Sequence, residues 1–179
     1  MSTTVALDLV LIVLLLLASA FDLRQRKIPN RLLALGMLSA LVLHLGSGQP
    51  SALLTAYLPG FVVGLVMFLP LYLLGGMAAG DVKLMATVGA FVGPALVFQA
   101  SLATYCAGGV LALAMVLWQR RGRLALANVF AILHPVLLRM HGSTLPPGSA
   151  AQAPASVGGM PYALAITAGT CTVLWLRHT

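Results

Sequence analysis

The sequence is poor in charge, and in negative charge above all. Asp and Glu together number three in 179 residues, and charged residues make up only 7% of the chain. Apolar residues make up 60% and the mean hydropathy is +1.02, which excludes an ordinary soluble domain. The apolar runs are long enough to cross a bilayer, which takes about 20 helical residues. We therefore expect an all-α, polytopic membrane helical bundle that forms one domain over residues 1–179.

Cysteine is also scarce, and its spacing argues against the usual metal and redox sites. Cys106 and Cys171 lie in separate apolar runs, and the chain has no C-x-x-C pair. We expect both to be small buried residues. His44 and His178 fall at segment ends, where we expect solvated or interfacial side chains. The sequence therefore predicts no metal and no cofactor.

The ten basic residues lie at the ends of the apolar segments, without interleaved aromatic residues, so we expect no nucleic-acid partner. Cytoplasmic loops of membrane proteins carry an excess of Lys and Arg. With six spans and the N-terminus outside, only Arg177 lies outside, and both termini are periplasmic. The basic residues then inside are Arg24, Arg26, Lys27, Arg31, Lys83, Arg120, Arg121, Arg123 and Arg139.

Hydropathy and turn residues divide the chain into six expected spans. They cover about 5–21, 31–45, 53–74, 82–98, 101–118 and 162–176. Because no basic residue precedes the first run, we expect a retained helix rather than a cleaved signal. In the third span, Gly60 and Gly64 predict close helix packing. Residues 124–140 have helical spacing and flanking arginines, which predicts a helix on the membrane surface, and 142–159 predicts a flexible loop.

Two of the three acidic residues fall at the ends of expected spans on the cytoplasmic side. An acid near a hydrocarbon layer costs about 2.5–3.5 kcal/mol at a helix centre on insertion scales, so Asp22 and Asp81 are functional candidates. Two carboxyl groups held close together share a proton, and can then act as base and acid on a peptide bond. Which aspartate is the base stays open. Alternatively, each aspartate merely ends or caps a helix, as we expect of interfacial Asp8.

The residues before Asp81 are small. Gly76, Ala78 and Gly80 carry little or no side chain, so an extended substrate peptide could approach the backbone there. Lys83 is two positions from Asp81 and points elsewhere on a helix, so we expect it to reach the lipid headgroups.

Three blocks of the sequence together resemble a known family. They are FDLRQRKIPN at 21–30, GDVKLMA at 80–86, and the Pro-Tyr pair at 161–162. This combination resembles the type IV prepilin peptidases, which are G-x-G-D intramembrane aspartic proteases. It is most similar to the short branch that serves Flp-type, tight-adherence pili. The family's catalytic pair maps onto Asp22 and Asp81, and its motif glycines onto Ala78 and Gly80, so Ala78 is a departure.

The resemblance implies a multi-pass protein of the bacterial inner membrane, in contact with lipid. It implies an aspartic endopeptidase that removes the basic leader peptide from prepilin or pseudopilin precursors at the cytoplasmic face. The implied partners also include the machinery for pilus assembly and protein secretion. Longer family members carry a cysteine-bearing insertion and also N-methylate the product. This chain lacks that insertion, so the resemblance implies a peptidase without methylation.

Two other classes of function remain open. The acids could relay protons in a small membrane transporter, although the chain shows no convincing internal repeat and its acids lie at one face rather than mid-membrane. The chain could also be an inactive scaffold of a pilus or secretion complex, in which case exchanging Asp22 or Asp81 for Asn would leave its function intact.

Overall fold

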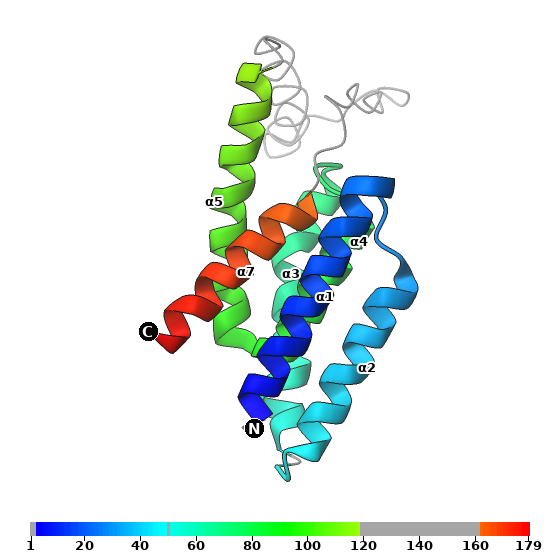
Figure 1. Ribbon diagram of the computed structural model, residues 1–179, viewed down its shortest axis with the longest axis vertical. Coiled ribbons are helices and arrows are strands. Elements are labelled where there is room, and N and C mark those ends of the chain that lie inside the picture. The colour runs from blue at the N-terminus through cyan, green and yellow to red at the C-terminus, as the bar shows by residue number, and fades with distance from the viewer. Residues whose placement is uncertain (1–2, 50, 119–161) are drawn as a thin grey trace, which may run out of the picture. The chain divides into compact units, whose positions relative to one another are not determined.

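Helices make up all the regular structure in residues 3–49, 51–118 and 162–179, the part of the chain that the computed structural model describes (Figure 1). A short π-helix, η1 (Leu53–Tyr57), leads into α3. The α-helices are α1 (Thr3–Gln25), α2 (Asn30–Gly46), α3 (Leu58–Leu73), α4 (Ala79–Val92), α5 (Pro94–Trp118) and α7 (Tyr162–His178). The surface helix and loop expected at 124–140 and 142–159 lie outside the described residues.

The prediction of an all-α membrane protein is confirmed. Three helical stretches of the described chain are long and apolar enough to cross a bilayer: Thr3–Gln25, Leu53–Leu73 and Pro94–Ala114. The chain divides into two compact units, Met1–Val110 with Pro161–Thr179, and Leu111–Met160. Of the second unit, only the end of α5 is described. All the contacts discussed below belong to the first.

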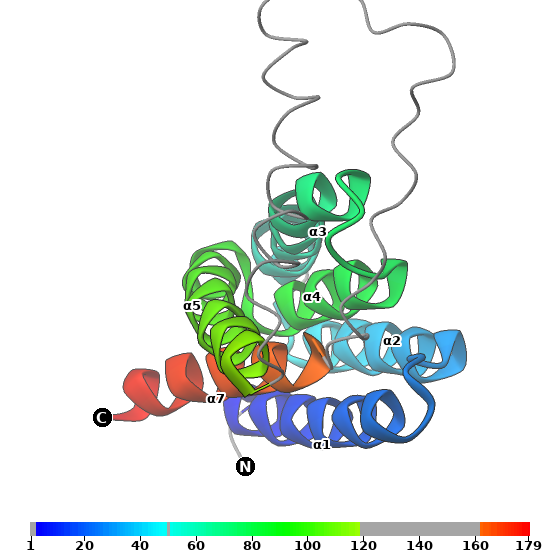
Figure 2. The same cartoon turned by 90° about the horizontal axis from the view of Figure 1, so that it is seen from above.

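Helix α4 is the most buried helix of the first unit. Ten of its 14 residues are buried, on every side of the helix, as expected for a helix that is apolar all round. Figure 2 shows α4 with α1, α2, α3 and α7 around it, and it contacts all four. Since Asp81 lies in its first turn, the best-packed element of the unit carries one of the two aspartates.

Glycines bring α3 and α4 into backbone contact. A Cβ atom at Gly60 would overlap the carbonyl group of Gly89, and a Cβ at Gly89 would overlap that of Gly60. A Cβ at Gly64 would overlap the carbonyl group of Met85. The helices therefore approach as closely as the small residues allow, as the sequence of the third span predicts.

The chain breaks between α4 and α5 at Gly93, rather than between 98 and 101 as expected from hydropathy. Gly93 has φ +84°, in the region that glycine adopts most readily, and Pro94 opens α5. A Gly-Pro pair that ends one helix and starts the next is a local signal. Because the residues on both sides of it are continuously apolar, hydropathy alone does not reveal this break.

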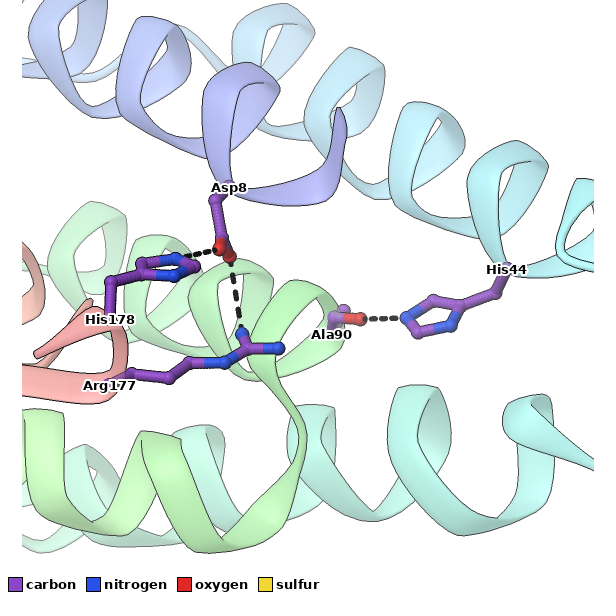
Figure 3. A network of polar contacts seen from close by, with 5 residues as sticks. All are labelled: Asp8, His44, Ala90, Arg177 and His178. Atoms are coloured by element: carbon purple, nitrogen blue, oxygen red, sulfur yellow. Dashed lines mark hydrogen bonds and ion pairs between the residues drawn. The ribbon is translucent and has the colours of Figure 1, made fainter. Parts of the chain in front are cut away.

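Helices α1 and α7 pack antiparallel, and the two ends of the chain lie at the same end of the unit (Figure 1). This pairing gives Asp8 partners that the sequence did not predict. Asp8 is buried, and its carboxylate accepts hydrogen bonds from Arg177 at 3.4 Å and His178 at 2.9 Å (Figure 3). His44 is also buried, and its Nε2 donates to the carbonyl oxygen of Ala90 at 3.0 Å. Buried polar groups need such partners.

The remaining expectations for single residues are met in part. The His178 side chain is half-exposed, as expected of a chain end, although it is paired with Asp8. Both cysteines are free, but Cys106 is exposed and Cys171 only partly buried, which corrects the expectation that both are buried. An exposed Cys106 on an apolar helix fits a lipid-facing position, where a small apolar residue costs nothing.

Candidate functional site

Asp22 and Asp81 line one pocket of about 270 Å³. It lies where α1 ends and where α2 and α4 begin. Both aspartate side chains are themselves largely buried, with relative exposures of 7% and 6%. The other lining residues are Arg26, Lys27, Ile28, Asn30, Ala78, Ala79, Gly80 and Lys83.

Asp22 is held by the start of α7. The helix α1 continues to Gln25, so Asp22 lies inside its last turn and not at its end. The backbone N–H of Ala163 donates to Asp22 Oδ2 at 3.1 Å, across 141 positions of sequence. Ala163 is the second residue of α7, where the free N–H groups and the helix dipole favour a negative charge.

Asp81 is held by the start of its own helix. It lies in the first turn of α4, and its Oδ2 accepts the backbone N–H of Ala78 at 3.2 Å. The Asp81 N–H in turn donates to the Ala78 carbonyl at 3.1 Å. Each of the two aspartates therefore sits at a helix N-terminus, one at that of α4 and one at that of α7. Two such termini at one pocket offset part of the cost of burying carboxylates there.

The pKa of Asp81 is raised from its ordinary 3.8 to about 6, chiefly by burial. The negative charge of Asp22 contributes to this rise, and the hydrogen bond from Ala78 opposes both effects. Asp81 precedes the span expected at 82–98 and lies outside the three candidate spans. A carboxyl group with a pKa near 6 exchanges its proton close to neutral pH, as acid–base catalysis requires.

The four predicted approach residues divide into two groups. Ala78, Gly80 and Lys83 line the pocket, whereas Gly76 lies outside the lining, in the turn that ends α3, and donates to Leu71 O at 2.8 Å. Lys83 Nζ donates to Asn30 Oδ1 at 3.3 Å. A Cβ at Gly80 would meet only ordinary contacts, the nearest being Ile28 Cβ at 3.5 Å. Packing therefore does not require glycine at position 80.

A second pocket, of about 330 Å³, adjoins the first and is apolar. Asn30 and Lys83 line both pockets, so their hydrogen bond forms part of the wall between them. The other residues around the second pocket come from α2, α3 and α4. They are Leu33, Ala34, Met37, Phe61, Leu65 and Ala86.

Sequence reasoning did not identify the contribution of α7 to the site. Ala163 contributes a backbone N–H, which leaves no trace in the residue type. Tyr162 was noticed only through the family resemblance, yet its side chain lies within electrostatic range of Asp81. No group of three or more His, Cys, Asp or Glu residues is placed to hold a metal ion among the residues that the structure describes.

Comparison with known proteins adds one finding. The model of a family described as the type IV leader peptidase family matches residues 9–113. The matched region contains both Asp22 and Asp81, and it ends before α7. No curated protein and no solved structure matches the chain.

Proposed function

Because this chain belongs to the type IV leader peptidase family, whose model matches more than half of its length, we propose that it is a membrane aspartic endopeptidase. Its proposed substrates are prepilins or pseudopilins of the type IV and Flp classes. It removes their leader at the cytoplasmic face of the bacterial inner membrane, without methylating the product. The observation that carries the proposal is that two of the three acidic residues of the chain line one pocket.

The chemistry that suits this pocket is hydrolysis by a carboxyl pair that shares one proton. The ionised aspartate takes a proton from a water molecule, whose oxygen attacks the peptide carbonyl carbon. The protonated aspartate donates to the carbonyl oxygen, where negative charge develops. The tetrahedral intermediate then collapses as the peptide C–N bond breaks. The departing nitrogen receives the proton taken from water, and the former carbonyl oxygen returns its proton to the second aspartate as the C=O bond re-forms. The pair is then singly protonated again.

The two pockets suggest how a leader peptide lies on the protein. A scissile peptide bond fits beside Ala78 and Gly80, where the backbone is open. The adjoining apolar pocket suits an apolar side chain next to that bond. Arg26, Lys27 and Lys83 line the first pocket and oppose a cationic side chain there, so the basic part of the leader lies outside it.

The test is cleavage of a candidate prepilin co-expressed with wild type, Asp22→Asn, Asp81→Asn and the control Asp8→Asn. Asp8 is an equally buried acid on α1, paired with Arg177 and His178 outside the pocket. We expect shortened pilin with wild type and Asp8→Asn only, with its new N-terminus assigned by mass spectrometry. Equal behaviour of all four proteins would contradict the proposal and favour transport or a scaffold role.

The pH dependence of cleavage follows from Asp81. Its raised pKa of about 6 means that the pair loses its shared proton as the pH rises through this value. We expect the cleavage rate of purified protein in detergent to fall about tenfold per pH unit above pH 6. The same shift makes the contribution of Asp81 to stability largest below pH 3.8 and lost as the pH rises through 6. A rate that is level or rises between pH 6 and 8 would contradict this assignment.

Exchanging Gly80 for Ala is expected to hinder substrate binding without affecting folding. The added methyl group meets only ordinary contacts, so Gly80→Ala is expected to accumulate in the membrane like wild type. It also narrows the approach to Asp81, so KM for a prepilin peptide is expected to rise several-fold. The matched control is Ala78→Gly, which removes a methyl group from the same pocket and is expected not to raise KM. Equal KM values for Gly80→Ala and wild type would show that the backbone there is not approached.

A further inference from the structure

The start of α7 contacts one member of the aspartate pair and lies within electrostatic range of the other. Ala163 N–H donates to Asp22, and the Tyr162 side chain lies within electrostatic range of Asp81. No other helix of the described chain makes a hydrogen bond to Asp22 from so far along the sequence. Since α7 lies outside the matched region 9–113, its role does not follow from the family match.

A chain of hydroxyl groups fastens this end of α7 to α1. Thr167 Oγ1 donates to the Ala163 carbonyl at 2.8 Å, and Ser19 Oγ lies 2.7 Å from Thr167 Oγ1. Either hydroxyl can donate to the other, and Thr167 Oγ1 also lies 3.4 Å from the Leu15 carbonyl oxygen of α1. Ser19 Oγ is also 3.3 Å from the same carbonyl.

The geometry makes Ala163 a shared point of contact. Its carbonyl faces the two hydroxyl groups, and its N–H faces the Asp22 carboxylate. Ser19 lies one helical turn before Asp22 on α1, and Thr167 one turn after Ala163 on α7. The hydroxyl groups therefore join α1 and α7 one helical turn away from the carboxylate.

We propose that Ser19 and Thr167 are positioning residues that fix Asp22 through the start of α7 for the proposed peptide cleavage. The inference rests on the proposed function, since it concerns the placement of that pair. Catalysis depends on such placement, because a displacement of about 1 Å at a reacting group costs up to about 100-fold in rate.

The test compares Thr167→Val with Thr172→Val in purified protein acting on a prepilin peptide. Thr172 is a matched control on the same helix: its hydroxyl makes the same kind of bond, to Ala168 O at 2.8 Å, but it is exposed. We expect Thr167→Val to lower kcat about 10- to 100-fold with KM unchanged. Thr167→Ser keeps the hydroxyl and is expected to restore most of kcat, while Thr172→Val behaves like wild type. Ser19→Ala should resemble Thr167→Val.

A second measurement needs no cleavage. Hydrogen–deuterium exchange, followed by peptide mass spectrometry, reports how well the Ala163 N–H is protected by its hydrogen bond to Asp22. If the hydroxyl groups hold Ala163 against Asp22, this amide is expected to exchange faster in Thr167→Val than in wild type and Thr172→Val.

These two measurements separate the inference from the function on which it rests. If wild type cleaves and Thr167→Val equals Thr172→Val in kcat and in amide exchange, the positioning role is overturned and the peptidase stands. If wild type fails to cleave any prepilin, the proposed function fails, and the exchange of the Ala163 amide alone decides whether these hydroxyl groups position Asp22. If neither Thr167→Val nor Thr167→Ser accumulates in the membrane, the role of Thr167 is merely structural.

Discussion

Exchanging Asp81 for Asn is expected to reduce the rate of leader cleavage by about 10³-fold or more. Asparagine has the shape of aspartate but cannot hold or release the shared proton. The side chain is 6% exposed, so bulk water cannot easily replace it as proton donor or acceptor. Asp22→Asn is expected to have the same effect, because either change leaves the pair without its exchangeable proton. The measurement is the single-turnover rate of purified variants on a prepilin peptide.

The double variant distinguishes a pair from two independent groups. If Asp22 and Asp81 act as a unit, the double exchange to Asn is expected to be no slower than either single exchange. If the two aspartates contributed independently, the fold-losses in rate of the two single exchanges would instead multiply. Asp8→Asn controls for the loss of a buried acid on α1, and it is expected to cleave like wild type even if its thermal midpoint falls. A single exchange in the pocket that keeps full activity would remove that aspartate from the mechanism.

Exchanging Gly89 for Ala is expected to destabilise the protein far more than exchanging Gly80 for Ala. The new Cβ would overlap the Gly60 carbonyl, and both groups belong to the backbones of packed helices, so neither can turn aside. Such overpacking costs about 1–3 kcal/mol, which lowers the thermal midpoint of a protein this size by about 5 °C. The midpoint is measured in detergent, from the fraction that stays monodisperse after heating.

The control for this prediction is Gly109→Ala. Gly109 also lies within a helix, α5, but a Cβ there meets no atom within 4 Å. Its exchange is expected to leave the midpoint unchanged or to raise it slightly, because Ala favours helix by up to about 1 kcal/mol. If both variants melt alike, the close approach of α3 and α4 does not limit stability.

Most of the fold could be predicted because the determining signals are local. Long apolar runs predict helices in a membrane, and Gly60 and Gly64 predict a close helix contact, which α3 and α4 make. The scarcity of acids also made Asp22 and Asp81 conspicuous, since a carboxylate near hydrocarbon is costly to keep. Their placement at one pocket follows from helices that begin or end on the same side.

The contacts that sequence reasoning missed join residues far apart. Helical periodicity assigns Asp8 and His44 to a helix face but says nothing of the partner opposite. Asp8 meets Arg177 and His178 only because α7 runs antiparallel to α1, and His44 meets a backbone carbonyl. The hydrogen bond to Asp22 likewise comes from a backbone N–H, which every residue except proline carries. Residue types alone could not have identified these partners.

The bond between Ala163 and Asp22 has a consequence for how the protein is made. It joins residues 141 positions apart, and a ribosome adds about 5–20 residues per second. A growing chain therefore contains both aspartates for several seconds before α7 is synthesised. During that interval Asp22 lacks the N–H group that holds it. Biosynthesis thus completes the hydrogen bonding of Asp22 only after α7 has been synthesised, and a chain interrupted earlier carries both acids without this contact.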